Sequence, residues 1–400
     1  MAYDIDAVRR AFPALDEGAA HFDGPGGSQV AAPVADAVAG TMRAAVANRG
    51  VVTTAEQRAE QIVVDARRAM ADLLAVDPAG VVFGRSMTAL TFDLSRALAQ
   101  QWAPGDEIVV TRLDHDANIR PWVIAAERAG AQVRWAAFDP DSAELSLGDV
   151  EAVLTERTRL VAVTAASNLF GTIPNVRAIS EATHSVGALV YVDGVHRAPH
   201  TAVDVETMGA DFFACSPYKF CGPHLGVLAA APALLETLQP DKLLPSSDAV
   251  PDRFELGTLP YELLAGVTAA VDFLAGLDPA AAGGRRERLL TSMSSLEEHE
   301  EALADRLESG LRELPGVTLH GSPARRTPTL LFSVDGWSPR EVQVGLAQHN
   351  VNAPAGSFYA VEAARWAGLG EQGAVRAGLA PYTNGDDVER LLQALDEMLG

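Results

Sequence analysis

Short apolar runs alternate with helical patterns between residues 78 and 230. Several runs are continuous stretches of aliphatic and β-branched residues, without the alternation of apolar and polar positions that a half-exposed strand shows. Such runs are typical of strands that are buried on both faces of a parallel sheet. We therefore predict seven strands, at residues 80–84, 107–113, 132–138, 159–167, 187–193, 211–216 and 226–230.

Helical patterns separate these strands, at residues 87–101, 120–130 and 176–187 and, in a shorter form, 205–209. Strands and helices in alternation predict βαβ units, so we expect an α/β fold with a large, doubly wound and mainly parallel sheet. Ligands of such sheets bind beyond the carboxyl ends of the strands. Residues that directly follow a strand are therefore the first candidates for a functional site.

The pattern changes after about residue 260, where residues 283–314 form a long amphipathic helix with acids and arginines on its outer face. Alternating strand-like and helical segments follow it and predict a smaller α+β domain; they span 327–336, 338–350, 374–382 and 386–399. The predicted organisation is an N-terminal segment at 1–20 that packs on the small domain, a large domain at 21–265 and a small C-terminal domain at 266–400.

The composition narrows the classes of partner. A net charge of −22 repels phosphate backbones and anionic membranes, so we expect neither a nucleic-acid nor a membrane partner. No apolar run approaches the roughly 20 residues that cross a bilayer, and the first residues lack a secretory pattern, which predicts a cytoplasmic protein. The spacing of Cys215 and Cys221 fits neither a usual zinc site nor a disulfide framework, so we expect buried thiols and no metal.

Lysine usage points to one position. Lys219 and Lys242 are the only lysines, and arginine supplies the remaining basic residues. A single lysine is usually a surface residue, but in this chain arginine serves at the surface. Lys219, in the stretch CSPYKFCGPHLGVLAA, directly follows a predicted strand, which indicates that a primary amine is needed there.

Other strand ends carry polar residues that could converge with Lys219. Ser86, Met87 and Thr88 lie between a strand and a helix, where backbone amides and hydroxyls favour a phosphate group; the alternative is a simple helix cap by Ser86. Asp193 ends a strand, and a carboxylate is costly to bury there without a cation unless it caps the next segment.

An amine, a carboxylate and a phosphate site in one sheet indicate pyridoxal phosphate. Lys219 would form a Schiff base with the aldehyde, Asp193 would keep the pyridine nitrogen protonated, and the helix start after Ser86 would take the phosphate. His115 also follows a strand, but a lone histidine in that position is more often structural. Its flanking aspartates point away from it in an extended chain, so they do not make a metal site with it.

Longer motifs resemble the class V aminotransferase family of fold-type I pyridoxal phosphate enzymes, in the cysteine desulfurase and selenocysteine lyase branch. The resemblance covers residues 20–395 and is carried by FDGPGG, DEIVVTRLDHDANIRPW, RTRLVAVTAASNLFGTIPN, ALVYVDGVH, RFELGT and AVRAGLAPY. Its most specific part is Ser216, Lys219, Gly222 and Pro223 at their distance from Asp193. It implies a large cofactor-binding domain, a smaller C-terminal domain and a homodimer.

The resemblance also implies a role for individual residues. Lys219 and Asp193 would hold the cofactor as described above, and His115 would stack on its ring as a further catalytic residue. Arg376 would bind the substrate α-carboxylate, a bidentate task that suits a guanidinium. The other implied cofactor-binding residues are Ser86, Met87, Thr88, Asn168, His196, Ser216 and Tyr218, with Thr258 reaching the phosphate of the neighbouring subunit.

Three departures from the branch leave the reaction open. The stretch NAPAGSFYA at 352–360 has no cysteine where desulfurases carry the persulfide-forming thiol, Tyr218 replaces a histidine, and His196 replaces a glutamine. We therefore expect a subgroup without that cysteine, in which the enzyme eliminates sulfur from a cysteine-like amino acid as a C–S lyase does. An epimerase similar to isopenicillin N epimerase, an aminotransferase and a non-catalytic or regulatory protein are the alternatives. A dinucleotide-binding enzyme is disfavoured because GPGG at 24–27 lacks the required spacing.

Overall fold

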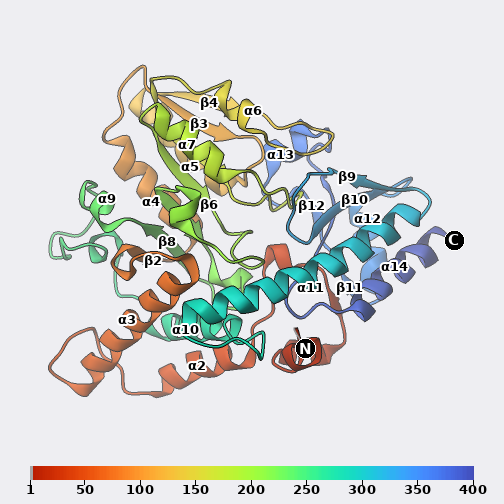
Figure 1. Ribbon diagram of the computed structural model, residues 1–400, viewed down its shortest axis with the longest axis horizontal. Coiled ribbons are helices and arrows are strands. Elements are labelled where there is room, and N and C mark those ends of the chain that lie inside the picture. Colours follow the sequence, from red (N-terminus) through yellow and green to blue (C-terminus); the bar gives the residue numbers. More distant parts are fainter. Residues whose placement is uncertain (1–2) are drawn as a thin grey trace.

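A seven-stranded sheet forms the larger part of the molecule, in a computed structural model that describes residues 3–400. The strand order is β2-β8-β7-β6-β5-β3-β4, and the sheet occupies the upper left of Figure 1. All seven predicted strands are present; β8 has the predicted bounds, β5 begins one residue earlier and ends three residues earlier, and the other five are shorter than predicted. They are β2 (Val81–Gly84), β3 (Glu107–Thr111), β4 (Gln132–Ala136), β5 (Thr158–Thr164), β6 (Leu189–Asp193), β7 (Phe212–Cys215) and β8 (Gly226–Ala230).

The sheet is mainly parallel, as predicted. Neighbours from β4 to β7 pair in parallel, whereas β8 is antiparallel to both β7 and β2. The parallel strands end at one edge, which brings Thr111, Thr164 and Asp193 to the same side of the molecule. The site described below lies beyond this edge.

Helices cover both faces of the sheet, which confirms the doubly wound α/β class. Alternate residues of one strand enter different cores: Leu160 and Ala162 pack with α4 and α5, whereas Val161 and Val163 pack with α3, α7 and α10. The helices of this part are α2 (Ala32–Arg43), α3 (Thr54–Leu74), α4 (Met87–Ala99), α5 (Arg120–Ala129), α6 (Leu147–Glu151), α7 (Val176–Ser185), α8 (Val205–Met208), α9 (Pro232–Glu236) and α10 (Tyr261–Leu274).

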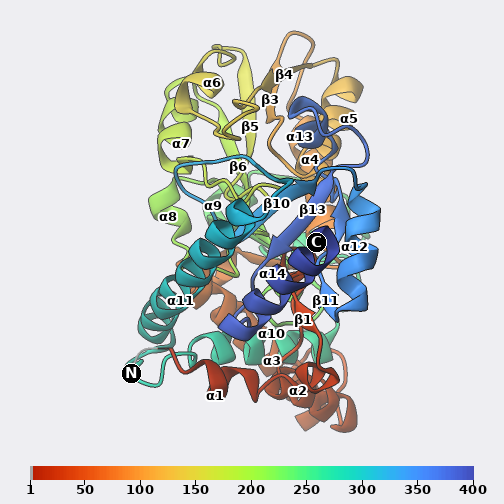
Figure 2. The same ribbon diagram turned by 90° about the vertical axis from the view of Figure 1, so that its right-hand side faces the viewer.

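A second sheet has four antiparallel strands in the order β12-β13-β10-β9; helices α11 and α12 pack on it, and α14 packs on these two helices and on β1 and β11. The long helix α11 runs diagonally from the region of α10 to this sheet (Figure 1 and Figure 2). The elements are α11 (Arg285–Glu313), β9 (Val317–His320), β10 (Thr329–Val334), α12 (Pro339–Gln348), β11 (Val351–Asn352), β12 (Ala355–Gly356), α13 (Val361–Trp366), β13 (Ala374–Gly378) and α14 (Gly385–Leu399).

The N-terminal segment contacts the C-terminal part of the chain. Arg9, at the end of α1 (Ile5–Arg9), donates to the carboxylate of Asp387 at 2.7 Å, and β1 (Ala20–His21) pairs with β11. Residues 1 and 2 of the predicted 1–20 segment lie outside the described residues. The predicted boundary at residue 265 falls inside α10, which packs on α2 and α3, so a division there cuts one helix in two.

Among residues 3–400, none of the helices combines the length and the apolar character that a bilayer crossing needs.

Candidate active site

The turn between β2 and α4 is held close to strand β8. A Cβ atom on Gly226 of β8 would lie 2.2 Å from the carbonyl carbon of Ser86 and 2.4 Å from the amide nitrogen of Met87, so only glycine allows this approach. The Ser86 hydroxyl accepts the Ala89 amide at 3.1 Å and thus caps α4. The first amides of a helix have no partner within it, so this turn presents N–H groups to an anion.

A cavity of about 50 Å³ lies beyond the carboxyl ends of the strands, next to this turn. We call it the inner cavity. Nine of the predicted site residues line it: Met87, Thr88, His115, Asn168, Asp193, His196, Ser216, Tyr218 and Lys219. Ser86 and Thr258 are not among its lining residues, and Arg376 lines a neighbouring cavity instead.

Lys219 enters the inner cavity from the short 3-10 helix Pro217–Lys219 that follows β7. The residue is 7% exposed, and no hydrogen bond or ion pair joins its Nζ atom to another residue within 3–400. Burial lowers the pKa of this amine, and the charge of Arg376 adds to the effect, while Asp193 opposes it. The amine is therefore easier to deprotonate than that of a surface lysine.

Asp193 lies at the end of β6 and is also buried. Its Oδ1 atom accepts the amide of Val195 at 2.9 Å. Burial raises the pKa of the carboxyl group above its usual value, and Lys219 is the nearby positive charge that acts in the other direction. A cationic group of a ligand beside Asp193 would stabilise the negative charge of this buried carboxylate.

His115 is neutral in this site, because burial, together with the charges of Lys219 and Arg376, lowers its pKa to about 3. Its Nδ1 atom accepts the amide of Ala117 at 3.0 Å, which assigns the ring proton to Nε2. The preceding residue, Asp114, contacts Thr111 and Asn118 rather than His115. The histidine and its flanking aspartates do not form a metal site: the described residues contain no suitable ligand group.

Two further residues of the inner cavity carry buried polar atoms without a partner. Asn168 donates through Nδ2 to the carbonyl of Phe358 at 2.9 Å, while its Oδ1 atom is unpaired. His196 uses Nε2 with the hydroxyls of Thr327 and Thr329, and its Nδ1 atom is unpaired. Unpaired buried polar atoms are costly, and both line the space that a bound group would fill.

Arg376, on β13, lines a second and larger cavity of about 660 Å³ that we call the outer cavity. The residue is 2% exposed, yet within the described chain no carboxylate pairs with it. Its Nη1 atom donates to the carbonyl of Asn168 at 2.7 Å, and its Nε atom has no partner. Burial lowers the pKa of Arg376 to about 9. A buried guanidinium in this condition favours an anionic ligand.

The residues present fit the predicted cofactor. The N-terminus of α4 can take a phosphate, Asp193 can pair with a ring nitrogen, Lys219 supplies a free amine, and the unpaired atoms of Asn168 and His196 supply polar contacts. His115 offers a neutral ring at the same cavity. Ser86 does not line the inner cavity; its oxygen accepts the Ala89 amide, and its O–H group remains a donor.

Several site residues were not predicted from the sequence as cavity-lining residues. Phe92, Asp116, Arg120, Phe358 and Tyr359 all line the outer cavity. The sequence did carry one signal for Phe92, which lies four residues after Thr88 and so on the same face of α4. His224 stacks on Tyr218 with ring centroids 4.8 Å apart, a contact that no pattern in the sequence indicated.

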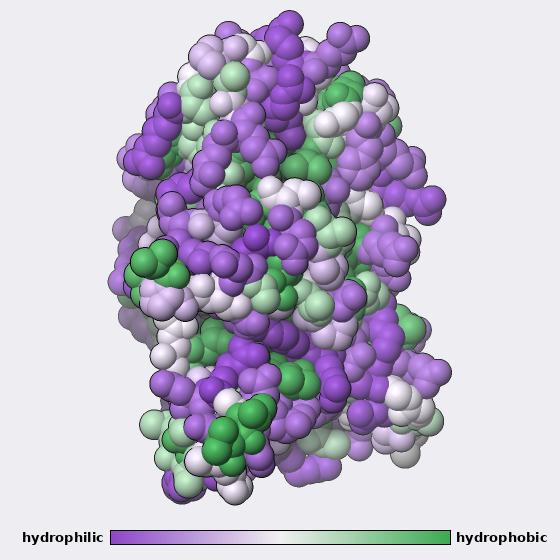
Figure 3. All heavy atoms as spheres, turned by 90° about the vertical axis from the view of Figure 1, so that its left-hand side faces the viewer, coloured by the Kyte–Doolittle hydropathy of each residue, from purple (hydrophilic) through white to green (hydrophobic). Residues whose placement is uncertain are grey.

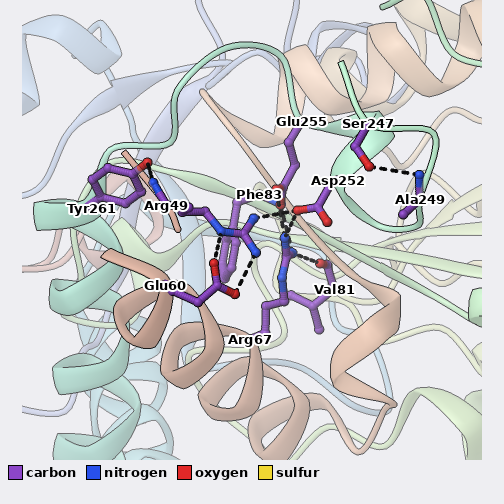
Figure 4. Close-up of polar contacts among 10 residues, drawn as sticks. All are labelled: Arg49, Glu60, Arg67, Val81, Phe83, Ser247, Ala249, Asp252, Glu255 and Tyr261. Atoms are coloured by element: carbon purple, nitrogen blue, oxygen red, sulfur yellow. Dashed lines mark hydrogen bonds and ion pairs between the residues drawn. The ribbon is translucent and has the colours of Figure 1, made fainter. Parts of the chain in front are cut away.

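Thr258 is exposed and lines neither cavity of its own chain. The segment that precedes it is fixed by an ion-pair network, drawn in Figure 4. Arg67 of α3 donates to Glu255 at 2.8 Å and to Asp252 at 3.2 Å, and Arg49 joins Asp252 to Glu60. The amide of Phe83 on β2 also donates to Glu255.

Comparison with known proteins gives consistent matches along the whole chain. The family described as aminotransferase class-V matches residues 20–391. An uncharacterized protein of Mycobacterium tuberculosis is 36% identical over 99% of both chains. The aminotransferase-like protein FGM3 of Gibberella zeae is 32% identical over 100% of this chain and 99% of its own. The crystal structure of the cysteine desulfurase CsdA from Escherichia coli superposes with a TM-score of 0.87 at 27% identity, with both chains fully covered.

Proposed function

The chain belongs to the aminotransferase class-V family, and from that premise we propose that it is a pyridoxal phosphate enzyme that acts at Cα and Cβ of an amino acid. The observation that carries the proposal is the convergence of Lys219, Asp193 and the first turn of α4 on one cavity. These groups come from three separate strand ends. Similarity over the full length to a cysteine desulfurase supports a reaction of the desulfurase type.

Each end of the cofactor would meet its own set of residues. Thr88, Ser216 and the amides at the start of α4 would hold the phosphate, and Asp193 would pair with the ring nitrogen. His115 would stack on the ring, with Asn168, His196 and Tyr218 around it. When bound, the cofactor supplies a protonated ring that withdraws electrons from the substrate Cα atom.

The protein's own part in the chemistry is to orient the substrate and to move one proton. Arg376 would bind the α-carboxylate in the outer cavity, since no ion pair joins its guanidinium to a carboxylate among the described residues, although Asp23 is a nearby negative charge. Lys219, once released from the cofactor by the substrate amine, would take the proton from Cα. Its lowered pKa favours the free amine that this step needs near neutral pH.

Elimination at Cβ is the reaction that we propose, with a thiol leaving from a cysteine-like substrate. Both cysteines of the chain, Cys215 and Cys221, are buried, and the segment at 352–360 contains none. Burial raises the pKa of the Cys221 thiol to about 12, so it is a poor acceptor for sulfur. We therefore expect the sulfur to leave as a free thiol or sulfide, together with pyruvate and ammonia, rather than as a persulfide on the enzyme.

We also propose a homodimer in which Thr258 reaches the phosphate site of the partner subunit. Thr258 is exposed and lines neither cavity of its own chain, which supports this role. The ion-pair network around Glu255 would hold the preceding segment in place. The face with α9 and the end of α3 carries separate hydrophobic clusters (Figure 3). Exposed apolar side chains occur in α2, between α2 and α3, and between α9 and α10; they include Met42, Val51, Val52, Leu243, Leu244 and Leu256. Sedimentation equilibrium of the purified protein would contradict this proposal by finding a monomer.

The cofactor part is tested by absorbance. Protein purified with pyridoxal phosphate should absorb in the visible range, Lys219→Ala should lose the band, and Lys242→Ala, the matched control, should keep it. A colourless wild-type protein that takes up no cofactor would contradict the proposal.

The reaction is tested with L-cysteine and its S-substituted derivatives. Release of thiol or sulfide with pyruvate is the expected result. Solvent deuterium that enters Cα without elimination would instead establish an epimerase, and accumulation of the amino form of the cofactor with a keto acid would establish an aminotransferase.

A further inference from the structure

Two consecutive residues near the cavity mouth have an unusual backbone. Phe358 and Tyr359 have φ angles of 53° and 59°, in the left-handed region that side chains larger than glycine rarely adopt. The pair follows Gly356, whose φ of 146° also requires glycine. Strain of this kind persists only where the surrounding structure holds it, and it concentrates at functional sites.

The contacts that hold this strained pair come from the active site itself. The Nδ2 atom of Asn168 donates to the carbonyl of Phe358 at 2.9 Å, and the amide of Asp116 donates to the carbonyl of Tyr359 at 2.8 Å. Ala360 closes the turn by donating to Ser357 at 2.8 Å. The loop is therefore fastened to the segments that follow two strands of the large sheet.

The ring of Phe358 covers one face of the proposed carboxylate-binding arginine. The Arg376 guanidinium carbon lies 3.8 Å from the ring centroid, which is the distance of a stacked cation and aromatic ring. Phe358 closes this face to a ligand, and the N–H groups that donate hydrogen bonds lie in the plane of the guanidinium. A carboxylate must then approach in the plane of the guanidinium, and this fixes the direction in which the rest of the substrate extends.

Tyr359 is 75% exposed, although its ring centroid lies only 5.5 Å from that of His115. The ring lines the outer cavity together with Phe92 and Phe358. Asp116 and Arg120 also line the outer cavity, and their side chains form an ion pair with each other at 3.0 Å. An exposed ring held in place by a strained backbone gains little from burial in the free protein, but a ligand that covers it would gain apolar contact.

We propose that Phe358 and Tyr359 determine substrate specificity and that they select α-amino acids with an extended apolar or aromatic side chain. The inference rests on the proposed function, because it takes Arg376 as the carboxylate site. The outer cavity of about 660 Å³ is also lined by Thr88, His115 and Lys219, so the cofactor would take part of this space. The part along Phe92, Phe358 and Tyr359 would be left for the side chain of the substrate. The aromatic surface would cover the part of the substrate beyond Cβ.

The test compares ligands that share the reacting atoms and differ only in the apolar group. Dissociation constants of L-cysteine, S-methyl-L-cysteine and S-benzyl-L-cysteine are measured on the holoenzyme from the spectral change of the bound cofactor. We expect wild type to bind the benzyl derivative at least about tenfold more tightly than L-cysteine, because the added ring buries apolar surface.

Variants assign this preference to the loop. Tyr359→Ala should remove most of the benzyl preference and leave the L-cysteine constant within about threefold, since a ring worth one to two kcal/mol corresponds to about tenfold in affinity. Tyr359→Phe keeps the ring and should keep the preference. Trp337→Ala, which removes an exposed aromatic side chain that lines neither cavity, is the matched control and should behave as wild type.

The possible failures can be told apart. A protein that takes up no cofactor, or whose spectrum responds to no amino acid, contradicts the proposed function. A protein that responds to all three ligands with equal affinity, or whose benzyl preference survives in Tyr359→Ala, leaves the proposed function intact and overturns the specificity proposal.

Discussion

Asp114 and His115 are neighbours in the sequence, and burial shifts their pKa values in opposite directions. The carboxyl of Asp114 is completely buried, and its pKa rises to about 8 in spite of hydrogen bonds from Thr111 and Asn118. The pKa of His115 falls to about 3. Both shifts have the same cause, since the interior disfavours whichever form is charged. At neutral pH both residues are therefore largely uncharged, and of the two only His115 lines the inner cavity.

Asp114 should therefore make folding stability depend on pH. Its ordinary pKa is 3.8, so between about pH 4 and pH 8 the folded protein keeps a proton that the unfolded chain has lost. The free energy of unfolding then falls as pH rises, by at most about 1.4 kcal/mol per pH unit. Asp114→Asn cannot titrate, and urea unfolding between pH 5 and pH 8 should show a weaker fall than in wild type.

The comparison with Asp114→Asn isolates this one group. His115 acts in the other direction. Below about pH 6.5 its imidazole is protonated in the unfolded chain but neutral in the folded protein, so the free energy of unfolding rises with pH up to that value. This contribution is common to wild type and variant and cancels in their difference. Identical pH profiles for the two proteins would contradict the assignment to Asp114.

The junction of β8 with α4 is the element that shapes the proposed phosphate site. Gly226→Ala places a methyl group 2.2 Å from the Ser86 carbonyl carbon, so the start of α4 must move. We expect a loss of about 1–3 kcal/mol in the free energy of unfolding, as for other overpacked positions, and weaker binding of pyridoxal phosphate in a titration. Gly40→Ala, in open space on α2, is the control and should stabilise the protein by about 0.5–1 kcal/mol. Cofactor binding unchanged in Gly226→Ala would contradict this account.

The ion pairs in Figure 4 join α3, β2 and the segment before Thr258. Arg67→Met leaves the buried carboxylate of Glu255 without its cation, which should cost about 3–5 kcal/mol. Arg177→Ala breaks an exposed pair with Glu181 on one helix and should cost no more than about 0.5 kcal/mol. Denaturant unfolding of both variants measures the difference, and equal losses would show that burial does not matter here.

On the scale of the whole molecule, the sequence predicted what local patterns determine. The strands of the large sheet follow from continuous apolar runs, and Lys219 and Asp193 follow from polar residues at strand ends. The antiparallel direction of β8 was not predictable, because the residues of that strand do not indicate which strands pair with it or in which direction. The backbone conformation of Phe358 was not predicted for a similar reason, because its carbonyl bonds to Asn168, 190 residues earlier in the chain.

The helix cap at Ser86 shows that the role of a residue can be undetermined by the sequence even within one turn of the chain. The sequence offered a helix cap and a phosphate ligand as roles for this hydroxyl, and only the position of the Ala89 amide relative to it shows that the cap is formed. Likewise, α10 runs through the boundary predicted at residue 265, because its packing on α2 and α3 is set by contacts between distant segments. Patterns along the chain thus indicate which residues matter, while distances between segments decide what each one does.

The central claim, that Lys219 anchors pyridoxal phosphate, is tested most directly by finding where the cofactor is attached. Holoenzyme is reduced with borohydride and digested, and the modified peptide is identified by mass spectrometry. The chain has only one other lysine, Lys242, which pairs with Asp248 at 2.9 Å and lines neither cavity, so it serves as an internal control. We expect the phosphopyridoxyl group on the peptide with Lys219 alone; its absence there, or equal labelling of Lys242, would contradict the account.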